Sequence, residues 1–409
     1  MRTHCALAII AGVARGQAHD PGSYGCNASE ADANDAAFMA LGGKHASACP
    51  RSAVWLGPLA RDCLPEDGDR NVLVVGGNKA YDCVGWARLA AGDAAYSAAA
   101  WTRRLEAAAN ATAIPCGECK QCRSDYPLVS RPAPSAAAPV VACVEPLPAN
   151  VDALKVAAAE PPWARVLRVV DAAAMDAPGS APFPVGLEFG METWGVRRRL
   201  RAGRGKGTSA QGRGRGANPP YDPPRLPAAS AFRNVTVTTV DDLVDAEFGG
   251  GRRPGATSVI SKGSEPESEP ESEPESEPES AGPSRPLSFF AGGAAPAILS
   301  VDAEGNDPLV LRGAARALAS GRVRYLEFEH QRYRAWSKLE LADTIRELDD
   351  FGYECFWALD KGKLVTITRC WHPTWTHKHS WSNVVCARRE DACAVETLRR
   401  FRAYDPSLA

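Results

Sequence analysis

The segment Ile298–Leu318, ILSVDAEGNDPLVLRGAARAL, decides the fold class. It begins with an apolar run that predicts a buried strand, and a glycine then turns the chain into residues with apolar helical spacing. Asp302 and Glu304 stand at the strand's end, where acidic side chains seldom collect unless they bind something or cap the next helix. Asn306 or Asp307 can serve as that cap. We therefore interpret Asp302 and Glu304 as functional residues.

Other apolar runs extend the pattern in both directions along the chain. Further strands are predicted at Val72–Val75, Val140–Val144, Val166–Val170, Val323–Phe328, Tyr353–Leu359, Leu364–Thr368 and Asn383–Ala387, with an extended segment at Val235–Val240. Helices are predicted after the first strands and at Pro308–Ala319 and Leu339–Phe351. Short apolar strands that alternate with helices indicate an α/β fold. We expect a mostly parallel seven-stranded sheet with an antiparallel edge strand and helices on both faces.

The upstream strands also end in residues that can bind a ligand. Gly76, Gly77 and Asn78 precede a helix N-terminus, where glycines let the backbone approach a ligand and N–H groups are unpaired. Glu145 can accept hydrogen bonds from the vicinal hydroxyls of a ribose, and Asp171 from an adenine amine. Each residue also has a plain structural explanation, as a turn, a loop glutamate or a turn-capping aspartate.

Taken in order, these segments resemble the FkbM family of S-adenosylmethionine-dependent O-methyltransferases. Ile298–Leu318 resembles that family's strand, Asp-x-Glu-Gly turn and helix ending Val-Leu-x-Gly-Ala. Val72–Tyr81 (VLVVGGNKAY) is similar to its cofactor loop, and Val141–Asn150 (VACVEPLPAN) to its Glu-Pro-x-x-x-Asn ribose strand. Tyr325–Trp336 and Trp381–Cys386 fit its later strands. The resemblance covers about residues 70–190 and 232–390 and implies a Rossmann-like class I methyltransferase fold.

The resemblance also implies S-adenosylmethionine as methyl donor and a hydroxyl of a glycan or small metabolite as acceptor. The cofactor-binding residues that it implies are Gly76, Gly77, Asn78 and Lys79 at the methionine end, Glu145 at the ribose, Asp171 near the adenine and Asp302 at the methionine amine or the reacting centre. The candidate bases for the acceptor hydroxyl are Asp302, Glu304 and His330. A surface histidine after a strand is the alternative interpretation of His330.

Two residues depart from the family pattern. Val74 stands where the family usually has Asp or Asn, and Ala80 stands where it usually has Gly. If the backbone at position 80 needs a positive φ, a side chain there narrows the approach to the cofactor. A catalytically inactive secreted binding or interaction protein is therefore the alternative function. A nicotinamide oxidoreductase is disfavoured because the G-x-G-x-x-G spacing is missing.

The N-terminus has the layout of a secretory signal peptide, with a charged start, an apolar stretch at Cys5–Ala14 and small residues up to position 18. The 13 cysteines fit an oxidising compartment, and Asn27, Asn110 and Asn234 each begin a glycosylation sequon. We therefore expect a protein of the secretory pathway with no membrane span in the mature chain. The formal net charge of -2 argues against a nucleic-acid partner.

The expected organisation is a signal peptide at 1–18, an irregular cysteine-containing extension at 19–70, the methyltransferase domain at 71–390 and a C-terminal tail at 391–409. The domain is interrupted by a cysteine-rich excursion at 92–138, a Gly/Arg/Pro-rich loop at 196–230 and an acidic Ser-Glu-Pro insert at 249–296. Proline lacks a backbone donor and the glutamates repel one another, so this insert is expected to be disordered.

Two cysteine and histidine clusters allow more than one interpretation. Cys116, Cys119 and Cys122 have the spacing of zinc ligands, which Cys83 or Cys143 would complete, but disulfides explain them better in a secreted chain. A second cluster is an acceptor-binding loop, a metal site or, as we prefer, a packed amphipathic loop. Its members are His372, His377, His379, Trp371, Trp375 and Trp381.

Overall fold

The structure is a computed structural model that describes residues 26–41, 53–64, 70–116, 119–129, 138–185, 189, 232–249, 296–331, 333–377 and 381–404. The expected signal peptide and the loop at 196–230 lie outside these residues, as does the acidic insert apart from its two end positions. The main sheet contains β1 (Val72–Val75), β2 (Val141–Glu145), β3 (Leu167–Asp171), β7 (Ile298–Val301), β8 (Tyr325–His330), β9 (Tyr353–Leu359), β10 (Lys363–Thr366) and β11 (Ser382–Arg388). These eight strands lie in the order β10-β9-β11-β8-β7-β1-β2-β3.

Five neighbouring strands, β3-β2-β1-β7-β8, run parallel to one another. This order is compatible with a doubly wound, Rossmann-like sheet, whose topological switch point then falls between β1 and β7. β11 pairs antiparallel with both β8 and β9, and β10 pairs antiparallel with β9 at the edge. The expected mostly parallel sheet with an antiparallel edge is therefore present, but it has eight strands instead of seven. Both strands of the β9–β10 hairpin belong to it, because β10 pairs along its whole length with β9, and Leu364 and Val365 of β10 are fully buried.

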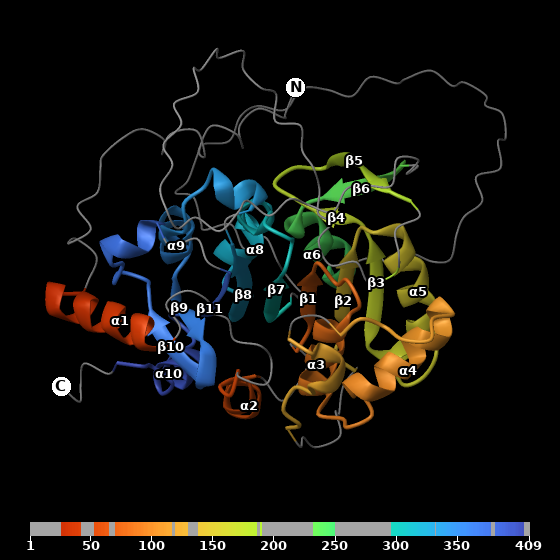
Figure 1. Cartoon of the computed structure of the whole chain (residues 1–409), viewed down its shortest axis with the longest axis horizontal. Helices are drawn as coiled ribbons and strands as arrows, with labels where there is room; N and C mark the ends of the chain where they lie inside the picture. Colours follow the sequence, from red (N-terminus) through yellow and green to blue (C-terminus); the bar gives the residue numbers. More distant parts are fainter. Residues whose placement is uncertain are drawn as a thin grey trace, which may run out of the picture.

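Helices cover both faces of the sheet, as Figure 1 shows. One face carries α3 (Tyr81–Ala91), α4 (Ala98–Ala109), α5 (Pro148–Ala158) and α10 (Ala392–Arg399). The other carries α1 (Ala28–Leu41), α6 (Val240–Phe248), α7 (Asp307–Arg312), α8 (Ala315–Ala319) and α9 (Leu341–Asp350). Strand residues alternate between the two cores: Val72 and Val74 join the first, Leu73 and Val75 the second. This burial on both sides explains the continuous apolar runs in the sequence.

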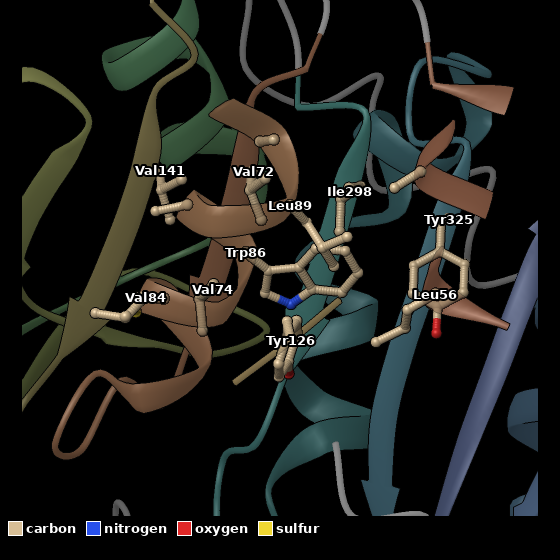
Figure 2. Close-up of a cluster of buried hydrophobic side chains, with 14 of the residues drawn as sticks. Leu56, Val72, Val74, Val84, Trp86, Leu89, Tyr126, Val141, Ile298 and Tyr325 are labelled. Carbon is tan, nitrogen blue, oxygen red and sulfur yellow. The ribbon is translucent and has the colours of Figure 1, made fainter. Parts of the chain in front are cut away.

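Trp86 of α3 is the centre of the first core and is fully buried. Figure 2 shows its indole between the β1 side chains and Ile298 of β7, with Tyr126 beside it. The Trp86 ring lies 5.5 Å from that of Tyr126 in an edge-to-face arrangement and 5.7 Å from that of Tyr325. Tyr126 comes from the cysteine-rich excursion, so this excursion packs into the domain.

A second, three-stranded sheet has the order β4-β6-β5 and consists of β4 (Ala173–Ala174), β5 (Gly179–Pro184) and β6 (Phe232–Thr238). The extended segment predicted from Val235 is its central strand. Pro182 and Pro184 lie in β5 at the sheet edge, where a missing backbone donor is tolerated. Its apolar core includes Leu147 and Met175, which places this small sheet directly beyond the end of β3.

The extension at 19–70 contains helices, whereas the sequence predicts irregular structure. Its described residues form α1, the short α2 (Leu56–Pro58) and a π-helical turn at Leu59–Cys63. Only Asn34 and Phe38 of α1 are buried, so the helix has no apolar stripe that the sequence could reveal. The Phe38 ring instead packs 4.4 Å from that of Trp357.

The tryptophan- and histidine-containing loop is covered by α1. Trp375 Nε1 donates a hydrogen bond of 2.7 Å to Asp35, and His372 Nε2 lies 3.2 Å from Asp32. The described part of this loop is therefore packed against α1, as preferred from the sequence. The side chain of His377 and all of His379 lie outside that part.

Five disulfides join described residues: Cys26–Cys370, Cys63–Cys393, Cys83–Cys143, Cys116–Cys122 and Cys355–Cys386. Cys119 is disulfide-bonded as well. The cysteines that have zinc-like spacing are thus paired as disulfides. Two of the bridges fasten the N-terminal extension to the C-terminal half of the chain, a separation of 344 and 330 residues.

We predict that Phe38→Ala lowers the free energy of unfolding by about 3 kcal/mol, because it removes a buried ring that packs on Trp357 and Trp375. Met39→Ala is the matched control, since the Met39 side chain in the same helix is 54% exposed. Denaturant unfolding of both variants measures the difference. Equal effects would show that α1 does not contribute to the core.

Candidate functional site

A cleft opens at the carboxyl ends of β1, β2 and β7, at the switch point of the sheet. It encloses about 600 Å³, including space open to solvent. Four segments line it: the end of β1 at 75–78, the end of β2 and start of α5 at 144–150, residues 172–175 after β3, and the loop at 302–306 after β7. The cleft thus brings together segments that are more than 200 residues apart in the sequence.

The glycine loop after β1 is fastened to the end of β2. The backbone N–H groups of Gly76 and Gly77 both donate to the carbonyl of Val144, at 3.0 and 2.9 Å. Gly76 has a φ of +87°, and a Cβ atom there would lie 1.6 Å from the carbonyl oxygen of Asp302. Only glycine fits this position, because both the backbone angle and the close approach of β7 exclude a side chain.

Glu145 is the central polar residue of the cleft and is only 5% exposed. Its carboxylate accepts hydrogen bonds from the backbone N–H of Asn78 at 2.7 Å, from that of Leu147 at 2.9 Å and from the Asn150 amide at 3.2 Å. Burial raises the pKa of the Glu145 carboxyl to about 7, although these three donors oppose the rise. A carboxylate has about four acceptor sites, so one acceptor site is left for a ligand hydroxyl.

The loop after β7 is organised by Asp307, which is fully buried. Its carboxylate accepts hydrogen bonds from the backbone N–H groups of Ala303, Gly305 and Glu329, at 3.3, 3.2 and 3.3 Å. The side chain therefore folds the loop back on itself and joins it to β8. Burial raises the pKa of Asp307 to about 7. Asp302 and Glu304 are carried on this loop and border the cleft.

The charged residues in the described lining of the cleft are acidic and not basic. Three carboxylate residues line it, Glu145, Asp302 and Glu304, and none of its described lining residues is a lysine or an arginine. Two of the non-glycine lining residues, Asn78 and Glu304, have a positive φ, of 43° and 52°. Such backbone conformations persist where the surroundings impose them, and they cluster at ligand sites.

The predicted site residues fall into two groups. Gly76, Asn78, Glu145, Asp302 and Glu304 line the cleft together. The others, which are Gly77, Lys79, Asp171 and His330, are not among its lining residues.

Each of these four has another environment. Gly77 packs against the sulfur of Cys143. Lys79 is buried, with only 2% of its surface exposed. Asp171 lies beside the cleft and is ion-paired at 3.4 Å with Lys155 and with Arg233. His330 is 2% exposed and its ring stands edge-on to Trp336, so it is neither the surface histidine nor the cleft base that the sequence suggests.

The departure at Ala80 does not obstruct the cleft. Its backbone does have a positive φ, of 59°, as the family glycine would allow. Its methyl group, however, is 1% exposed and belongs to the core beneath α3. Ala80 therefore has a strained backbone but does not narrow the cleft, of which it is not a lining residue.

Sequence reasoning missed two residues that build the site. Asn150 is 1% exposed, and its amide donates to both Glu145 and Asn78. Its position in the Glu-Pro-x-x-x-Asn pattern was the available signal. Asp307 could be interpreted only as a helix cap, because its three backbone partners come together through the tertiary fold.

No known protein family, curated protein or solved structure matches the chain. None of the helices within the described ranges has the length and apolar character of a membrane span. The geometry of the cleft and the sequence resemblance therefore carry the functional interpretation.

We predict that Gly76→Ala destroys the cleft, lowering the free energy of unfolding by more than about 2 kcal/mol. The added methyl would collide with the Asp302 carbonyl in a backbone conformation that alanine adopts poorly. Gly179→Ala is the control, because a Cβ there meets nothing within 4 Å. Thermal unfolding compares the two variants, and wild-type stability of the Gly76 variant would contradict the described close approach.

The buried carboxyls also predict a pH dependence of stability. Burial raises the pKa of Glu145, Asp307 and Glu327 to about 7, from 4.5 for the glutamates and 3.8 for the aspartate. Between about pH 4.5 and 7 the folded protein thus binds more protons than the unfolded chain, so stability falls as the pH rises. The melting temperature should be higher at pH 5 than at pH 7.5. Glu145→Gln should reduce this difference, and an unchanged slope would show that Glu145 titrates normally.

Proposed function

We propose that this protein is an S-adenosylmethionine-dependent methyltransferase that acts on a hydroxyl of a glycan or small metabolite. The observation that carries the proposal is the acidic, glycine-bordered cleft at the switch point of the sheet. S-adenosylmethionine carries a sulfonium and an ammonium group against a single carboxylate and is therefore a net cation, so a site whose described lining has carboxylates and no basic residue suits this donor. The sequence resemblance to the FkbM family points to the same ligand.

The cleft residues fit the parts of the donor molecule. Glu145 has acceptor capacity for a ribose hydroxyl, while its other hydrogen bonds hold the Asn78 backbone in place. The alanines at 172–174 and Leu147 offer an apolar wall for a planar base. Asp302 and Glu304 lie on the loop across the cleft, where they can attract the cationic groups.

When bound, S-adenosylmethionine supplies a methyl carbon that is open to in-line displacement by an alcohol oxygen. The contribution of this chain is to orient the two reactants and to keep water away from them. Asp302 and Glu304 are the cleft carboxylates that can take the proton of the acceptor hydroxyl at a carboxylate oxygen. His330 is buried behind Trp336, so we do not assign it this role.

The same electrostatics disfavour a nicotinamide oxidoreductase. The pyrophosphate of a dinucleotide needs N–H donors or cations, and a negative charge about 4 Å from a carboxylate costs on the order of 4 kcal/mol at an effective dielectric constant of 20. The three lining carboxylates would repel it.

We also propose that the protein works in the secretory pathway. The five disulfides between described residues are typical of oxidising compartments. The asparagines of all three sequons, Asn27, Asn110 and Asn234, are exposed. Surface exposure is what glycosylation requires of an acceptor.

Calorimetric titration with S-adenosylmethionine, S-adenosylhomocysteine and NAD tests the proposal. We expect the two adenosyl compounds to bind and NAD not to bind. Glu145→Gln should weaken binding about 10- to 100-fold, because the variant loses hydrogen bonds to a charged acceptor. The control is Asp152→Asn, an equal charge change at an exposed position of α5.

An acceptor screen with labelled methyl donor then tests catalysis, and Asp302→Asn should abolish any transfer while the chain still folds. Binding without transfer to any acceptor would favour an inactive binding protein. Absence of binding to either adenosyl compound would refute the proposed function.

A further inference from the structure

A second pocket lies between α9 and the segment at 367–376 that follows β10. It encloses about 780 Å³, including space open to solvent, and shares no lining residue with the cleft. An inference about this pocket does not depend on the proposed function.

The pocket has one aromatic wall and several polar groups. Trp371 is partly exposed and belongs to a tryptophan group, with ring centroids 5.8 Å from Trp357 and 5.7 Å from Trp375. Ile345 and Ile367 add apolar surface at the base. An indole fixed by two others is a rigid surface for a flat or ring-shaped ligand.

Two ion pairs between arginine and aspartate also line the pocket beside Trp371. Arg369 Nε donates to both oxygens of Asp349, at 3.1 and 3.0 Å, and Arg346 is paired with Asp343 at 2.7 Å. Asp349 also pairs with Arg389, so its carboxylate is held from two sides. Glu340 and Thr376 complete the polar lining.

The position of Arg369 is imposed by its neighbours. Its backbone has a φ of 55°, a strained value for a residue other than glycine. The Arg369 carbonyl accepts a hydrogen bond of 2.9 Å from the backbone of Cys26, whose disulfide partner Cys370 comes next in the chain. The N-terminal extension thus helps to build the pocket.

The charged side chains around the pocket indicate which kind of ligand it can bind. The lining has three carboxylates and two guanidinium groups, and Asp349 also pairs with Arg389, which is not a lining residue, so these charges balance. Because each guanidinium of the lining is already paired with a carboxylate, an anion gains little there. A purely apolar ligand would desolvate the ion pairs without replacing their hydrogen bonds. Vicinal hydroxyls can donate to carboxylates and accept from guanidinium groups, and the C–H face of a sugar ring can pack on an indole. We propose that this pocket binds a neutral saccharide.

Saturation-transfer NMR and calorimetry with maltose, lactose and N,N'-diacetylchitobiose test the proposal on the full chain. We expect at least one disaccharide to bind with a dissociation constant of roughly 1 mM, as suits a small open site. Asp343→Asn should weaken binding about fivefold or more, because it changes a polar group of the lining at an exposed position. Trp371→Ala should abolish it.

Glu347→Gln is the matched control on the same helix, since Glu347 is exposed, pairs with Arg312 and is not a lining residue. It should leave binding unchanged. If circular dichroism shows that Trp371→Ala fails to fold, the test rests on the other two variants. Weaker disaccharide binding by Asp343→Asn than by Glu347→Gln then supports the proposed site. The proposal is overturned if none of the three disaccharides binds at 50 mM (about 50-fold above the expected constant), if both carboxylate variants behave alike, or if inorganic phosphate displaces the sugar.

Discussion

The backbone of Gly76 lies so close to the carbonyl oxygen of Asp302 that no side chain fits at position 76. This contact brings the end of β1 against the end of β7 at the switch point, where the N–H of Asp302 also donates to the carbonyl of Val75. The loop that begins at Gly76 then reaches the end of β2 and binds Glu145 through the Asn78 N–H. The close approach of β1 to β7 thus joins the glycine loop to the two strand ends that carry the acidic residues, Glu145 after β2 and Asp302 and Glu304 after β7.

Burying carboxylates at these strand ends costs desolvation free energy, and hydrogen bonds from the backbone offset part of that cost. Glu145 and Asp307 are buried, and burial raises the pKa of each to about 7. Backbone N–H groups from the surrounding loops donate to both of them and favour the charged forms. The same hydrogen bonds fix the loops, and Glu145 both shapes the cleft and lines it as a carboxylate. A cation bound in the cleft would lower the remaining desolvation cost of the Glu145 carboxylate.

The N-terminal extension is a structural part of the domain. The Cys26–Cys370 and Cys63–Cys393 bridges and the Phe38 ring attach it to the last strands and to α10. Its helix covers the tryptophan loop, and the backbone N–H of Cys26, just before that helix, donates to the Arg369 carbonyl at the second pocket. The cleft and the second pocket therefore depend on different contacts. Backbone hydrogen bonds at strand ends support the cleft, whereas a disulfide and tilted or edge-on indole contacts support the pocket.

Residue pattern alone determined the α/β class and the positions of the main strands. It also predicted nine site residues, of which five line the cleft together. Buried parallel strands read as apolar runs, and their carboxyl ends fall at one sheet edge, so the polar residues that follow Val75, Val144 and Val301 had to lie near one another. Tertiary structure alone decided the partners of Asp307, the burial of His330 and the ion pairs of Asp171, because these depend on contacts between distant segments. It also decided that α1 packs as a helix, since two buried side chains leave no periodic signal in the sequence.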